Sequence, residues 1–148
     1  MKNSHSDIQY EFVVPIKTVP ESNRDGEHYI TKSKRHRTQK LHMWAVLHDK
    51  HMDIQLPCRI KLTRIAPRKL DKNDNLPVSM KWLIDEICDY IFPGQAAGRA
   101  DDTDEIDFIF DQEKGKPKEY AVRVTIYQRK ECCCPCHRQS KSEGVLLC

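Results

Sequence analysis

Apolar and polar positions alternate in several segments along the chain, a pattern typical of half-buried strands. The clearest alternation places Ile60 and Leu62 on one face of a strand, with charged neighbours on the other. We expect the last two strands to form an antiparallel hairpin around the turn at 114–117. The predicted strands cover residues 9–16, 28–31, 57–65, 106–110 and 120–126.

Two further segments carry apolar residues at helical spacing. The first, 33–49, has an incomplete apolar stripe formed by Leu41, Trp44, Ala45 and Leu47. The second begins near Pro77, with Asp74 or Asn75 as a possible cap, and ends at Pro93. Its broad apolar face consists of Met80, Leu83, Ile84, Ile87, Cys88 and Ile91. The predicted fold class is therefore α+β, a mixed β-sheet with two main helices in the order β-β-α-β-α-β-β.

The bulk composition fits one folded domain followed by a different C-terminal segment. At 148 residues the chain is long enough for one core, and its net charge of +3 does not by itself indicate nucleic-acid binding. No apolar run is long enough to cross a bilayer and the N-terminus lacks a signal core, so we expect a cytoplasmic protein without membrane contact. We predict a folded domain at 1–130 and a Cys-rich, disordered tail at 131–148.

The tail offers one alternative interpretation. Five of the seven cysteines fall in the last seventeen residues, and Cys133 and Cys136 have C-x-x-C spacing. His137 or Cys148 could complete a tetrahedral zinc site with them. Structural zinc sites usually take ligand pairs from two separated segments, whereas the tail has one cluster, so a disordered and oxidisable terminus is the favoured interpretation.

Basic residues gather at the start of the first predicted helix. Cations at a helix N-terminus oppose the helix dipole, and a phosphate backbone would relieve that repulsion. A solvated, charged helix end is the alternative. The candidate DNA-binding residues are Lys32, Lys34, Arg35, Arg37 and Lys40.

Two groups of aspartates stand out in this chain, which has a small excess of basic residues. Asp71 and Asp74 lie between a predicted strand and a predicted helix, and Asp101 and Asp102 precede a later strand. Carboxylates brought together near cations suit a hard cation such as Mg²⁺. The alternative for the first group is a structural turn, since Asp and Asn readily bond to nearby backbone N–H groups. A calcium loop is excluded, because Leu76 stands where such a loop needs glycine.

Several of these features occur together in the order seen in a known family. They are the opening strand followed by Ser22-Asn23-Arg24, the basic helix, the segment KLDKNDNLPVSMKWLIDEI, the pair Asp101-Asp102, and a closing pair of strands with Asp111-Gln112 and Lys114-Gly115. Over residues 9–128 the chain resembles the RusA-type Holliday junction resolvases, endonucleases that cut four-way DNA junctions.

The resemblance implies specific roles. The family's paired aspartates match Asp71 and Asp74, its downstream acidic ligand matches Asp102 or Asp101, and its helix lysine matches Lys81. The family form Asp-x-Asp-Asn has one residue between its aspartates, whereas two separate Asp71 from Asp74 here.

The activity implied by the resemblance is that of a homodimeric endonuclease that resolves Holliday junctions and other branched DNA in recombination and repair. Its cofactor would be Mg²⁺, with Mn²⁺ as a substitute. Asp71, Asp74 and Asp102, with Lys81, are the expected catalytic residues, and Asp101 is a further metal-ligand candidate. The alternative is a non-catalytic nucleic-acid-binding protein that retains the fold.

Overall fold

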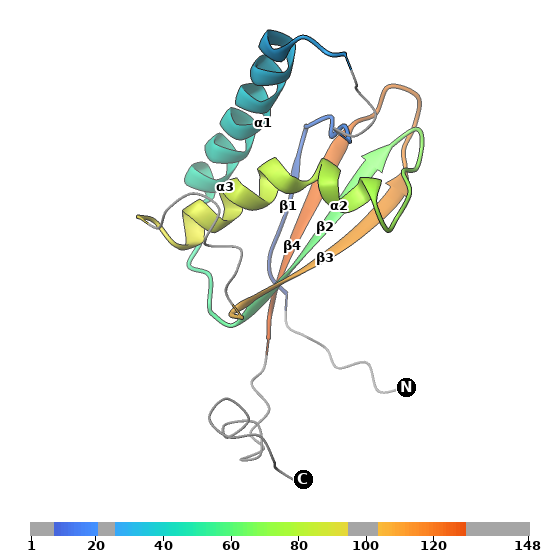
Figure 1. Ribbon diagram of the computed structural model, residues 1–148. Helices are drawn as coiled ribbons and strands as arrows, with labels where there is room; N and C mark the ends of the chain where they lie inside the picture. Colours follow the sequence, from blue (N-terminus) through green and yellow to red (C-terminus); the bar gives the residue numbers. More distant parts are fainter. Residues whose placement is uncertain (1–7, 21–25, 95–103, 130–148) are drawn as a thin grey trace, which may run out of the picture.

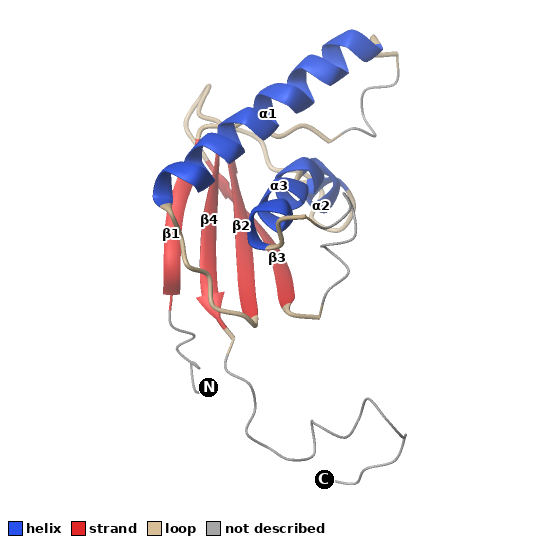
Figure 2. Ribbon diagram, turned by 90° about the vertical axis from the view of Figure 1, so that its left-hand side faces the viewer, coloured by secondary structure: helices blue, strands red, loops and turns tan. Residues whose placement is uncertain are grey.

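The computed structural model describes residues 8–20, 26–94 and 104–129, which form a four-stranded sheet with helices on one face (Figures 1 and 2). The predicted α+β class with a mixed sheet is confirmed. The predicted tail at 131–148 lies outside the described residues. In chain order the elements are β1 (Ile8–Val14), α1 (Tyr29–Lys50), β2 (Cys58–Ala66), α2 (Asn75–Ser79), α3 (Lys81–Ile91), β3 (Ile106–Lys114) and β4 (Ala121–Gln128).

The strand order in the sheet is β1-β4-β2-β3. β4 pairs antiparallel with both β1 and β2, whereas β2 and β3 are parallel. The parallel pair needs a crossover, and the chain makes it through α2 and α3. The register runs from Cys58 beside Ile106 to Ala66 beside Lys114, so β2 and β3 begin at one end of the sheet and finish at the other.

The predicted hairpin between the last two strands is wrong, because β2 lies between β3 and β4. After β3 the chain passes across the end of β2, where the Gly115 N–H donates to the Ala66 carbonyl (2.8 Å). This arrangement pairs β2 along both edges, as expected for the strand that carries the fully buried Ile60 and Leu62. The short connection alone could not distinguish it from a hairpin.

The predicted short strand at 28–31 is also wrong, because these residues begin α1. His28 is the N-cap: its ring accepts from the Ile30 N–H (3.4 Å), and its carbonyl accepts from the Thr31 and Lys32 N–H groups (3.0 and 3.2 Å). The observed order is therefore β-α-β-α-α-β-β. The second predicted helix is divided at Met80 into α2 and α3, which replaces one expected helix by two.

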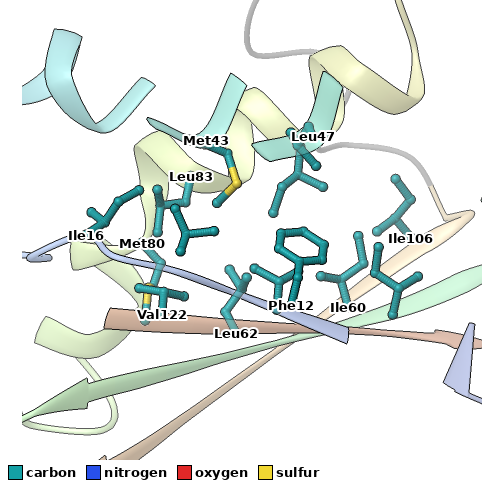
Figure 3. Close-up of a cluster of buried hydrophobic side chains, with 14 of the residues drawn as sticks. Phe12, Ile16, Met43, Leu47, Ile60, Leu62, Met80, Leu83, Ile106 and Val122 are labelled. Carbon is teal, nitrogen blue, oxygen red and sulfur yellow. The ribbon is translucent and has the colours of Figure 1, made fainter. Parts of the chain in front are cut away.

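The core lies between the helices and one face of the sheet (Figure 3). Met43 and Leu47 of α1 and Leu83 of α3 face Phe12, Ile60 and Leu62 of the strands. The predicted apolar face of the second helical segment is confirmed, since its members are buried or partly buried. Core residues from both layers have no exposed surface. They include Val14, Ile60, Leu62, Leu76, Met80, Leu83, Ile87, Val122, Val124 and Ile126.

The apolar stripe predicted for α1 is largely wrong. Leu41 and Trp44 are 56% and 52% exposed, and the buried residues are Gln39, Met43 and Leu47. Gln39 tolerates burial because its side-chain amide donates to the Lys17 carbonyl (2.9 Å). The N-terminal part of α1 extends beyond the end of the sheet (Figures 1 and 2). None of the described helices is both long enough and apolar enough to cross a membrane.

Candidate functional site

The loop 67–74, which carries the first acidic group, is attached to the sheet at two points. The Leu70 N–H donates to the Gln112 side-chain oxygen, and the Gln112 amide donates back to the Leu70 carbonyl, both at 2.8 Å. The guanidinium of Arg64 donates to the Arg68 carbonyl (2.7 Å). Because these bonds anchor the loop to β2 and β3, the residues that follow are held in a defined place.

The two aspartates of this loop are used differently. The Asp71 side chain accepts from the Asn73 N–H (3.0 Å) and its carbonyl accepts from the Leu76 N–H (2.9 Å), so Asp71 shapes the turn. Asp74 occupies the N-cap position of α2 but makes no side-chain capping bond. Both residues are exposed. The carboxylate of Asp74 is thus open to solvent, and Asp71 keeps one oxygen outside the turn bond.

A third carboxylate, that of Asp111 on β3, lies near the same loop and was not among the predicted site residues. Gln112, the next residue, anchors the loop, and the Lys61 ammonium lies 3.3 Å from the Asp111 carboxylate. The pKa of Asp111 is lowered, first by the bond from the Gln112 N–H (2.8 Å) and further by Lys61 and by Lys72 of the loop. Asp111 is therefore ionised at neutral pH. Asp111 is placed near the loop by the parallel register of β2 and β3, which sets it beside Thr63 near the end of β2.

Lys81 is the first residue of α3 and is exposed. The break at the buried Met80 separates it from α2, which begins just after Asp74. Lys81 therefore does not belong to the short helix whose N-cap position Asp74 occupies.

The second predicted acidic group, Asp101 and Asp102, lies outside the described residues. Asp104, which follows it closely, lies in the turn just before β3, where its carbonyl accepts from the Arg129 guanidinium (2.7 Å). The loop with Asp71 and Asp74 follows the opposite end of β2. The two ends of the parallel pair are eight residue steps apart in register, which is about 26 Å at roughly 3.3 Å per residue. The structure thus separates Asp104 from the Asp71–Asp74 loop by the length of the sheet.

The predicted DNA-binding residues of α1 fall into two groups. The Arg35 guanidinium pairs with Glu27 (2.6 Å), and the Lys40 ammonium lies 3.5 Å from the carboxylate of Glu86 on α3. The other three are exposed. They lie in the N-terminal part of α1, which extends beyond the end of the sheet where β2 finishes (Figures 1 and 2). The exposed residues are Lys32, Lys34 and Arg37.

The two described cysteines are structural. Cys58 and Cys88 are buried and carry free thiols. Burial raises the pKa of Cys58 to about 11, against the smaller lowering by Arg129. Cys58 is therefore a protonated thiol at neutral pH and not a nucleophile.

Comparison with models of known protein families and with curated proteins gives no match to this chain. Within residues 8–20, 26–94 and 104–129, no group of three or more His, Cys, Asp or Glu side chains is placed to hold a metal ion.

Proposed function

We propose that this protein is a Mg²⁺-dependent endonuclease that acts on branched DNA, as its resemblance to the RusA-type resolvases implies. The observation that carries the proposal is the presentation of Asp71 and Asp74 on a loop anchored by Gln112 and Arg64. Exposed cations of α1 lie toward the same end of the sheet. Such cations would hold the phosphate backbone near carboxylates that would otherwise repel it.

The residues present suit a hard divalent cation. Asp74 offers an exposed carboxylate without a capping bond, and Asp71, three positions earlier on the same loop, offers the oxygen that the turn bond leaves over. Asp101 and Asp102 are proposed as further ligands. A bound Mg²⁺ would polarise the scissile phosphate and lower the pKa of an attacking water. Lys81, exposed at the start of α3, would offset negative charge on the phosphate.

The proposal includes a two-fold homodimer. Resolution of a four-way junction needs two cuts on opposing strands, and a symmetric dimer supplies one site for each cut. A second protomer would also offer a way around the distance of about 26 Å between the two ends of the β2–β3 pair. The acidic residues that precede β3 in one protomer would then serve the Asp71–Asp74 loop of the other. Mixing Asp74→Asn and Asp102→Asn proteins tests this: recovered cleavage would assign the two ligands to different protomers.

A second candidate is a non-catalytic nucleic-acid-binding protein with the same fold. Its support is that one Asp71 oxygen is used within the turn, as expected of an aspartate with a structural role. Under this alternative the exposed cations of α1 bind DNA, and the acidic loop is a turn between β2 and α2.

Cleavage of a synthetic four-way junction separates the two candidates. The purified protein is incubated with labelled junction in Mg²⁺, in Mn²⁺ and in EDTA, with linear duplex of the same sequence as the control. The endonuclease proposal expects paired nicks in the junction with either metal and none in EDTA. Binding of the junction without cleavage under any metal condition would favour the non-catalytic candidate.

A further inference from the structure

A groove of about 410 Å³ runs between α1 and α3. This volume is within the range of roughly 300–1,000 Å³ typical of small-ligand sites. The groove contains both tryptophans of the chain, one from each helix. Its principal lining residues are His36, Arg37, Lys40, Leu41, Trp44 and Trp82.

Each tryptophan of the groove already lies against a histidine ring. The His36 ring lies against the Trp82 ring, with centroids 4.0 Å apart, and the Trp44 ring stacks on His48 at 4.4 Å. Trp44 is nevertheless 52% exposed, as is much of the neighbouring Leu41. A tryptophan supported by another ring and open to solvent is a ready platform for a further flat ring.

Positive charge borders this platform. Arg37 is exposed on α1, and the Lys40 ammonium lies 5.6 Å from the centre of the Trp82 ring. The carboxylate among the lining residues, that of Glu86, is mostly buried and lies 3.5 Å from the Lys40 ammonium. The open part of the groove therefore combines the aromatic surface of Trp44 with the exposed cation of Arg37.

We propose that this groove binds an unpaired nucleotide of single-stranded DNA, with the base stacked on Trp44 and the phosphate held by Arg37. A nucleotide combines a flat π-face with an adjacent negative charge, which is the pairing that the groove presents. In a duplex the same face is covered by neighbouring bases, so the groove selects strands that have opened. The inference rests on the proposed function for the choice of DNA and deepens it, since a branch point is where bases become unpaired.

Intrinsic fluorescence tests the proposal directly, because Trp44 and Trp82 are the only tryptophans. The full-length protein is titrated in EDTA with oligothymidylate, which does not absorb at the emission wavelength, and with duplex DNA. We expect quenching by the single strand and much less by the duplex. Because stacking persists when charges are screened, part of the quenching should remain at high salt.

Variants at two exposed aromatic positions of α1 supply the test, at Trp44, and its control, at Tyr29. Trp44→Leu should weaken oligothymidylate binding, followed by anisotropy of a labelled strand, by roughly 5- to 100-fold. Trp44→Phe should retain most of the affinity. Tyr29→Leu removes a ring that is 72% exposed on the same helix outside the groove and should change little. Equal affinity of Trp44→Leu and the parent would overturn the proposal.

The outcomes also separate this inference from the endonuclease proposal. Quenching and the Trp44 effect are measured without metal, so they stand even if the protein never cuts DNA. Conversely, junction cleavage with no quenching by single strands would overturn the groove proposal alone. If polyglutamate quenches the tryptophans as strongly as oligothymidylate does, the groove binds acidic peptides and the nucleotide assignment is wrong.

Discussion

Replacing Gln112 with alanine removes the clamp that holds the acidic loop against β3. The side chain makes two bonds of 2.8 Å to the backbone of Leu70. At roughly 0.5–1.5 kcal/mol for each bond, the loss in unfolding free energy should be about 1–3 kcal/mol. Leu70 is partly buried, so water can replace part of the loss and a value in the lower half of that range is expected. Urea denaturation measures this cost.

Hydrogen exchange and junction cleavage show the local effect of Gln112→Ala on the acidic loop. Hydrogen exchange of the Leu70 amide should accelerate in Gln112→Ala, because this N–H loses its acceptor. Junction cleavage should fall more than junction binding, because the loop positions the metal ligands and not the cations of α1.

Gln9→Ala is the matched control, since Gln9 clamps the backbone of Gln55 in the same way through bonds of 2.9 and 3.2 Å. It should lower stability without a selective loss of cleavage. Unchanged Leu70 exchange in Gln112→Ala would refute the clamp, and unchanged cleavage would refute its importance for the site.

Three further predictions concern acid stability, DNA affinity and assembly. Because the pKa of Asp111 is lowered in the folded state by the Gln112 N–H and by Lys61, its contribution to stability is present above the unfolded value of about 4 and is lost as pH falls below it. Asp111→Asn should therefore lose less unfolding free energy between neutral and acidic pH than the parent. Arg37→Ala should reduce the slope of log junction affinity against log salt concentration by roughly one unit. Arg35→Ala, which removes the ion pair with Glu27, should mainly lower stability. Sedimentation at micromolar concentration should show a dimer, and a monomer that persists with junction DNA would contradict paired cutting.

Much of the fold follows from local pattern. The alternation around Ile60 and Leu62 identifies a strand with one buried face, and both residues are fully buried. The apolar face that contains Leu83 and Ile87 likewise identifies a core helix. These predictions hold because a period of two or of 3.6 residues reflects burial directly.

The errors arise where burial depends on distant parts of the chain. Leu41 and Trp44 have helical spacing but remain exposed, because neither the sheet nor α3 fully covers that side of α1. The last two strands are close in sequence, yet β2 separates them, which a local pattern cannot reveal. The aspartates of the loop could be located from the sequence. The clamp between Leu70 and Gln112 joins positions forty-two residues apart, so only the folded register places Asp111 nearby.

Junction cleavage by Asp74→Asn tests the proposed metal site most directly. The change keeps the size of the side chain and removes the charge proposed to hold Mg²⁺, so the fold should survive and metal-free junction affinity should hold or rise. Cleavage in Mg²⁺ should fall by orders of magnitude. Asp89→Asn, the same change at an exposed position of α3, is the control and should cut at the parental rate. Cleavage by Asp74→Asn at the parental rate would contradict the metal-site assignment.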